Sequence, residues 1–412
     1  MTFEQLFLLS LFDIREGYRY TDNIRLKTDL GRKMAKAKII IKGKKKKNLG
    51  WPIYVLTVIL SIMFIFIGNK YASGKVNFFT DNNIDSVKAE IISITQVFKD
   101  SQDLGDGVSM ETKDILFEAK ILSGSQKGTV VSAVQKINSY FMVPANEAVV
   151  GDKVVLVGVS DETYKVNWLY SQYLRTDKLI IASAIFGALL ILFGQRKGLQ
   201  TLISLTFTIL SVFFVFIPAV LSGYNIYLWT MITSIYITVM TLIIVSGINK
   251  KTIAAIIGCM SGVIFSAVLV LFMSNALKLT GVIDEESVFL LMINPESPID
   301  LKGIFFGAIV LGALGAIMDV SMSISTSLYE MKEKYAANSF KQLFTSGMTI
   351  GKDIMGTMAN TLILAYIGSS LSTVLLMIVN RPSVLYLMNI ELVTIELLQA
   401  VIGSLGILMT LP

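Results

Sequence analysis

Histidine is absent from this chain of 412 residues, and cysteine occurs once, as Cys259. The lack of histidine excludes the Ser-His-Asp and Cys-His catalytic arrangements and the HExxH zinc motif, because each of them needs an imidazole. A single cysteine also excludes an intramolecular disulfide. Acidic, lysine, tyrosine and hydroxyl side chains stay open as catalysts. We nevertheless expect no enzymatic activity, no metal site and no other cofactor.

Charged residues are few, at 16%, whereas hydrophobic residues make up 53% of the chain and the mean hydropathy is +0.66. This composition excludes an ordinary soluble globular protein and indicates a multi-pass membrane protein. We therefore expect the protein to be embedded in the lipid bilayer. The net charge of +6 does not indicate a nucleic-acid partner. The basic residues cluster beside apolar runs, where the positive-inside rule accounts for them.

Long apolar runs predict an α-helical polytopic membrane protein with about eight transmembrane helices. The first helix is predicted at residues 51–68, after a basic cytoplasmic segment at residues 1–50. An amphipathic helix along the inner membrane surface is predicted at residues 335–350. Loops with paired lysines all fall on one side, so both termini are expected in the cytoplasm. The other seven transmembrane helices are predicted at residues 178–194, 199–220, 226–247, 252–277, 303–330, 354–379 and 391–412.

Residues 69–176, between the first and second transmembrane helices, have a different character and are expected outside the cell. Glycine-containing turns separate five short runs rich in β-forming residues. Five such strands predict a small, extracellular, all-β domain that resembles an OB barrel. Residues 177–412 would then form a bundle of seven helices. The five runs are residues 87–98, 116–122, 128–134, 152–159 and 164–173.

The sixth predicted transmembrane helix carries a polar stripe. Steps of three or four residues place six residues on one helical face. A carboxylate near the middle of a membrane costs about 2.5–3.5 kcal/mol, so it should face protein or water and is often functional. The other reading is that the small and hydroxyl side chains only pack helices together. The stripe consists of Gly312, Gly315, Asp319, Ser323, Thr326 and Glu330.

A second polar stripe is predicted on the seventh transmembrane helix, with Asp353, Gly356 and Asn360 in helical phase. Because sequential helices usually pack as neighbours, this stripe is expected to face Asp319. The candidates for ion or proton coupling are the polar members of both stripes: Asp319, Ser323, Thr326, Glu330, Asp353 and Asn360. The candidates for close helix packing are six glycines: Gly312, Gly315, Gly356, Gly368, Gly403 and Gly406.

Three segments carry a resemblance to a known family: GALGAIMDVSMSISTSLYEM from residue 312, GKDIMGTMANTLILAYIGSSL from residue 351 and the terminal GSLGILMTLP. They resemble the YibE/YibF family of bacterial multi-pass membrane proteins, and the likeness covers roughly residue 174 onward. The additional first span and outward domain resemble the YibE type. The resemblance implies a bacterial plasma membrane and a YibF-type membrane partner or a homo-oligomer.

Two functions follow as hypotheses. The leading one is an ion- or proton-coupled transporter or export-assisting protein, in which Asp319 is the buried coupling group. The alternative is a membrane-anchored binding or assembly protein, in which the extracellular β domain recruits a partner or an envelope component. An aspartyl intramembrane protease is not indicated, because the residues before Asp319 lack the GxGD pattern.

Overall fold

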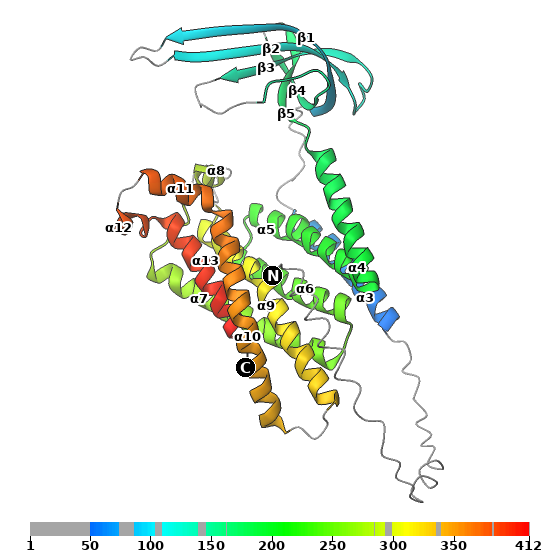
Figure 1. The fold of residues 1–412 in the computed structure, drawn as a ribbon, viewed down its shortest axis with the longest axis vertical. Coiled ribbons are helices and arrows are strands. Elements are labelled where there is room, and N and C mark those ends of the chain that lie inside the picture. The colour runs from blue at the N-terminus through cyan, green and yellow to red at the C-terminus, as the bar shows by residue number, and fades with distance from the viewer. Residues whose placement is uncertain are drawn as a thin grey trace, which may run out of the picture. The chain divides into compact units, whose positions relative to one another are not determined.

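A computed structural model describes residues 50–73, 86–103, 109–138, 146–161, 163–283, 285–292, 299–334, 339–380 and 383–411. Apart from Gly50, the predicted cytoplasmic segment at residues 1–50 lies outside the described residues. The described chain consists of a β domain and a set of helices (Figure 1).

The β domain is a closed barrel with the strand order β1-β2-β3-β5-β4, and β4 pairs with β1 to complete it. Neighbouring strands are antiparallel except β3 and β5, which run parallel. The structure thus confirms a small five-stranded barrel early in the chain. The strands are β1 (Ser86–Asp103), β2 (Ser109–Ile121), β3 (Val130–Asn138), β4 (Lys153–Asp161) and β5 (Val166–Tyr173).

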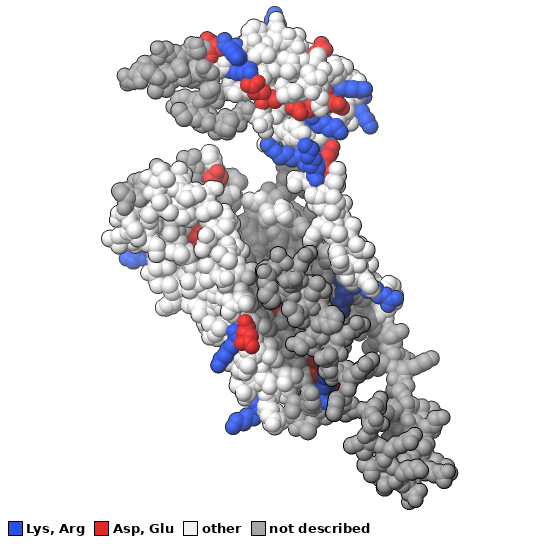
Figure 2. Space-filling model, in the orientation of Figure 1, with Lys and Arg blue, Asp and Glu red and all other residues white. Residues whose placement is uncertain are grey.

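Alternation along the strands decides which side chains fill the barrel. In β2, Ile115, Phe117 and Ile121 are buried in its interior, because successive side chains of a strand point to opposite faces. Trp168 of β5 joins the same core. The outer surface of the β domain carries many charged side chains, whereas the visible surface of the helices is mostly uncharged (Figure 2). Uncharged helix surfaces are those expected of segments that contact lipid.

Among the described residues, six helical segments are long and apolar enough to cross a membrane. Such segments are typical of a polytopic membrane protein. The predicted number of eight spans stays a prediction. The six segments are Trp51–Ala72, Thr176–Leu221, Ile226–Ser246, Lys250–Ala276, Leu301–Lys334 and Glu391–Leu408.

The segment Thr176–Leu221 contains two helices joined by a tight turn. Within α4 (Thr176–Ser211), Gln195 has φ 49° and ψ −124°, which is not helical. A Cβ atom on Gly187 would lie 3.7 Å from the Leu202 side chain, so the chain folds back on itself at this turn (Figure 1). The turn falls in the basic loop that separates the predicted spans 178–194 and 199–220. A π-helix, η2 (Val212–Phe216), and the short α5 (Ile217–Leu221) follow.

Helix α9 (Leu301–Lys334) is the centre of the helix bundle (Figure 1). It packs against four other helices, and its buried side chains form much of the main hydrophobic core. The four are α6 (Ile226–Ser246), α7 (Lys250–Ala276), α10 (Phe340–Ser369) and α13 (Glu391–Leu408). Helix α3 (Gly50–Ala72) contacts α6 at its edge, and the shorter helices are α8 (Glu285–Met292), α11 (Leu371–Asn380) and α12 (Val384–Leu387).

Helix α10 differs from the prediction of an interfacial helix at residues 335–350 and a separate span at residues 354–379. One continuous helix begins after the capping box of Ser339 and Gln342 and ends at Ser369. Gly347 and Gly351 do not interrupt it, because they lie against Leu328 and Leu411 and serve close packing. The break comes after Ser369 instead, where α11 begins a second helix. Residues 335–338 of the predicted interfacial helix lie outside the described residues.

Candidate functional site

The polar stripe of α9 lies on the side of the helix that the bundle leaves open. Gly312, Gly315, Asp319 and Ser323 are exposed, and so is Glu330 at the charged end of the helix; Thr326 is half-buried. The opposite face is buried in the core through Ile309, Ile317, Val320 and Ile324. Within the described residues, the Asp319 carboxylate has neither a hydrogen bond nor an ion pair.

A crevice of about 330 Å³ lies beside this stripe, between the second half of α4, α6 and α9. Gly315 forms part of its wall, and Asp319 follows Gly315 by one helical turn. Four hydroxyl side chains line the crevice among aliphatic ones, and two of them are joined, since Ser204 Oγ donates to Thr241 Oγ1 at 3.0 Å. The crevice therefore offers oxygen atoms to a proton, a water molecule or a small cation close to the acid. The four hydroxyls belong to Thr201, Ser204, Thr208 and Thr241.

The stripe of α10 is not brought to Asp319. Asp353, Gly356 and Asn360 are exposed, whereas the face of α10 that packs on α9 and α13 contains Gly351 and Leu362. The reason is the helical phase: the close contacts of the small residues set which side of α10 turns inward, and the polar residues fall on the other side.

The six glycines proposed for packing fall into two groups. Gly403 lies against Leu362, Gly406 against Ser266 and Ile317, and Gly312 near the Tyr366 hydroxyl. In contrast, a Cβ atom on Gly315, Gly356 or Gly368 would meet no described atom within 4 Å. These three glycines leave space on the helix surface.

The sequence interpretation missed a column of hydroxyls on α6. Thr230, Thr233, Ser234 and Thr238 are all fully buried, and Thr241 continues the column into the crevice. Their spacing of three to four residues was a readable signal. It was missed because threonines in an apolar helix usually bond their own backbone, as Thr230 and Thr238 do.

Two hydroxyls in this column do not form such a hydrogen bond to the backbone. Thr233 Oγ1 and Ser234 Oγ have no hydrogen-bond partner among the described residues. A buried unsatisfied polar group costs about 1–3 kcal/mol, so it usually has a water or ion partner or a functional reason. Together with the crevice, the column places oxygen atoms along the interior face of α6.

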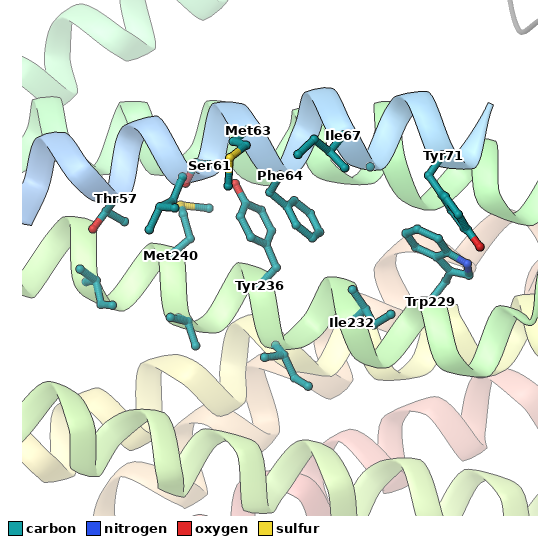
Figure 3. A pocket seen from close by; sticks show the side chains of 15 residues that line it. Thr57, Ser61, Met63, Phe64, Ile67, Tyr71, Trp229, Ile232, Tyr236 and Met240 are labelled. Atoms are coloured by element: carbon teal, nitrogen blue, oxygen red, sulfur yellow. The ribbon is translucent and has the colours of Figure 1, made fainter. Parts of the chain in front are cut away.

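A larger groove of about 650 Å³ lies between α3 and α6, and its chemistry is different (Figure 3). Phe64 and Tyr236 stack across it with ring centroids 4.0 Å apart, and Tyr71 and Trp229 lie at one end. None of its lining residues is charged or belongs to α9. It therefore offers an apolar surface and no group for ion coupling.

The described part of the chain contains no group of three or more acidic or cysteine side chains close enough to share a metal ion. Cys259 is buried, with its Sγ atom 3.6 Å from Thr238 Oγ1.

The apolar helices and the inserted barrel define a polytopic helical membrane protein with a small β domain. A family model described as YibE/F-like protein matches residues 121–412, and the chain belongs to this family. Comparisons with curated proteins and with solved structures gave no match.

Proposed function

We propose that this protein is an ion- or proton-coupled transporter or export-assisting protein, in which Asp319 takes up and releases a proton or small cation. The observation that carries the proposal is an acid without a partner in the described chain, on a membrane helix, one turn from a crevice lined by hydroxyls. An intramembrane acid is costly and so is retained mainly for function. This function needs no enzymatic step and no cofactor.

The membrane potential supplies the driving force in this proposal. Moving one elementary charge across 100 mV is worth about 2.3 kcal/mol, enough to shift a two-state equilibrium strongly. Protonation of Asp319 would remove the charge from the open face of α9, and deprotonation would restore it. Such a change alters the free energy of any arrangement in which that face contacts lipid.

The exposed stripe also bears on partners. Lipid is a poor neighbour for a carboxylate and for Ser323, so we propose that a YibF-type protein or a second copy of this chain covers this face. The proposed location is the bacterial plasma membrane, with both termini in the cytoplasm and residues 69–176 outside.

The test is flux into proteoliposomes that contain a pH-sensitive dye, with an imposed potassium-diffusion potential. The wild-type protein should give potential-driven proton uptake, which the dye reports. Asp319→Asn should lower the rate at least tenfold towards that of empty vesicles, because the carboxamide cannot titrate. Glu333→Gln, which changes an exposed acid at the charged end of the same helix, should leave the rate unchanged. Undiminished flux in the Asp319→Asn protein would refute the proposal.

A second candidate function is binding by the barrel, which would recruit a partner or an envelope component. The observation that favours it is that four large apolar side chains of β1 are exposed rather than buried. Sedimentation of the full-length protein with purified envelope fragments tests it, and a loss of sedimentation when two of these residues become alanine would support it. The residues are Ile92, Ile94, Val97 and Phe98.

A further inference from the structure

One row of side chains crosses the outer face of the barrel over three strands. Phe98 of β1 lies directly opposite Asp114 of β2, and Asp114 lies directly opposite Lys136 of β3. Residues opposite each other in neighbouring strands have side chains on the same face. Because Ile115 points into the core, Asp114 and its two neighbours face outward.

Tyr164, from the connection between β4 and β5, covers this row. Its ring stacks on the Phe98 ring, with centroids 5.4 Å apart and planes inclined by 28°. Its hydroxyl donates a hydrogen bond of 2.7 Å to Asp114 Oδ2. The Lys136 ammonium lies 5.8 Å from the centre of the same ring. Two aromatic rings and two charged groups from four parts of the chain therefore meet at one place.

Asp161 fixes the position of Tyr164. Its side chain is only 7% exposed, forms an ion pair with Lys136 and accepts hydrogen bonds from the backbone N–H groups of Thr163 and Tyr164. The bond with Lys136 is the main reason why the pKa of Asp161 lies below its ordinary value. The hydrogen bond from its hydroxyl to Asp114 raises the pKa of Tyr164 to about 12. The cluster is thus formed before any ligand arrives, which lowers the entropic cost of binding.

The exposure of Phe98 shows where a ligand would lie. Phe98 is 44% exposed although it stacks on Tyr164, so a wide apolar plane faces solvent with polar groups at its edge. Asp100, two residues along β1, lies on the same face, opposite Thr112. Among the residues of this row and those that hold Tyr164, the three carboxylates of Asp100, Asp114 and Asp161 outnumber the ammonium of Lys136. This balance disfavours a polyanion such as a nucleic acid.

We propose that this cluster, formed by Phe98, Asp114, Lys136 and Tyr164, binds a neutral oligosaccharide. The apolar face of a sugar ring fits an exposed aromatic plane, and its hydroxyls can donate to Asp114 and accept from Lys136. The outer face of strands 2 and 3, next to the connection between strands 4 and 5, is also where five-stranded barrels of the OB type hold oligonucleotides or oligosaccharides, and the excess of carboxylates here favours the neutral ligand. The inference names a ligand for the second candidate function and is independent of Asp319.

The experiment is titration calorimetry of the full-length protein in lipid nanodiscs with three neutral probes: chitohexaose, cellohexaose and maltohexaose. At least one probe should bind saturably at one site. Phe98→Ala should weaken binding at least tenfold, and Tyr164→Leu should do the same by removing the second ring. Val150→Ala, which truncates an exposed apolar residue in the turn before β4, should bind as the wild type does.

Four outcomes would overturn the inference. They are no saturable binding of any of the three probes, unchanged affinity in both aromatic variants, equal weakening by Val150→Ala, and tighter binding of a twelve-residue thymidine oligonucleotide than of any saccharide. The far-ultraviolet circular dichroism of each variant must match the wild type, and Tyr164→Leu serves as the test if Phe98→Ala fails this condition. Envelope sedimentation without saccharide binding would refute this inference alone and leave the second candidate function standing.

Discussion

The contact between α7 and α13 gives the sharpest test of how the bundle is held together. Gly262 of α7 lies so close to α13 that a Cβ atom there would be 2.7 Å from the carbonyl oxygen of Gly406 and 2.7 Å from Thr410 Cγ2. It would also lie 3.1 Å from Ile317 Cγ2 of α9. A backbone oxygen cannot rotate away, so Gly262→Ala must push two helices apart.

The expected loss follows from two opposing terms. Inserting a methyl group into a well-packed core costs about 1–3 kcal/mol. Replacing glycine by alanine inside a helix stabilises the folded state by about 0.5–1 kcal/mol. The overpacking term is the larger over most of its range, so we expect a net loss of up to about 2 kcal/mol and a fall in apparent Tm of about 2–4 °C for each kcal/mol lost.

Cys259 provides the assay. It is the only cysteine of the chain and is fully buried, about one helical turn from Gly262. A maleimide dye that fluoresces on reaction with a thiol will label it only when the bundle opens. Heating the purified protein in detergent with this dye therefore reports unfolding of the helices around the altered contact.

Gly356→Ala is the matched control, since a Cβ atom on Gly356 would meet no described atom within 4 Å. It should leave the apparent Tm unchanged or raise it slightly through helix propensity. Equal falls for the two variants, or no fall for Gly262→Ala, would refute the reasoning about the contact of α7 with α13.

Two further predictions concern polar contacts. The Glu391 carboxylate accepts hydrogen bonds from the backbone N–H groups of Thr280 and Gly281 and, at 2.8 Å, from Thr280 Oγ1. Glu391→Ala should therefore lower the stability of the helices by about 1.5–3 kcal/mol. The same thiol assay should show a lower Tm, and an unchanged Tm would contradict this. Because Lys136 lowers the pKa of Asp161, the stabilisation is present above the ordinary pKa of about 3.9 and is lost as pH falls through the lower folded-state value. Asp161→Asn should therefore make the stability of the barrel less dependent on pH below about pH 4. Unfolding of the barrel is followed by the fluorescence of Trp168, in a protein whose other two tryptophans are replaced by phenylalanine. Identical pH profiles for the two proteins would contradict the prediction.

Much of the architecture could be read from the sequence, because both of its parts have strong local signals. Twenty apolar residues must be helical in lipid, since every backbone polar group needs an internal partner. The five β-rich runs correspond to the five strands, because β-forming residues are concentrated in each run and glycine-containing turns lie near Gly105, Gly124 and Gly151. These patterns depend on short stretches of chain, so no knowledge of the fold was needed.

The path of the chain around Gly351 could not be read in the same way. A glycine near charged residues resembles the end of a helix, yet α10 continues through it because Ile324 and Leu411 occupy the space beside it. That space is created by helices distant in sequence. The same holds for the polar stripe of α10, because the phase of a helix does not say which of its faces packs.

The candidate site was likewise predicted only in part from the sequence. The acid of α9 stood out, because a lone carboxylate in an apolar run is rare. The crevice did not, since it needs the turn at Gln195 to bring Ser204 and Thr208 against α6 and α9. Only a three-dimensional arrangement shows that hydroxyls from two other helices gather near Gly315.

The junction between the barrel and the helices has a mechanical consequence. Only Leu174 and Arg175 separate the last strand from α4, and Lys88 of β1 forms an ion pair of 3.0 Å with Asp177 in the first turn of that helix. Beyond the turn at Gln195, the same helix supplies Thr201 and Ser204 to the crevice wall. Tension on the β domain therefore has a continuous covalent route, along α4 and through its turn, to the wall next to the α9 acid, and a load taken up by one part would be felt by the other.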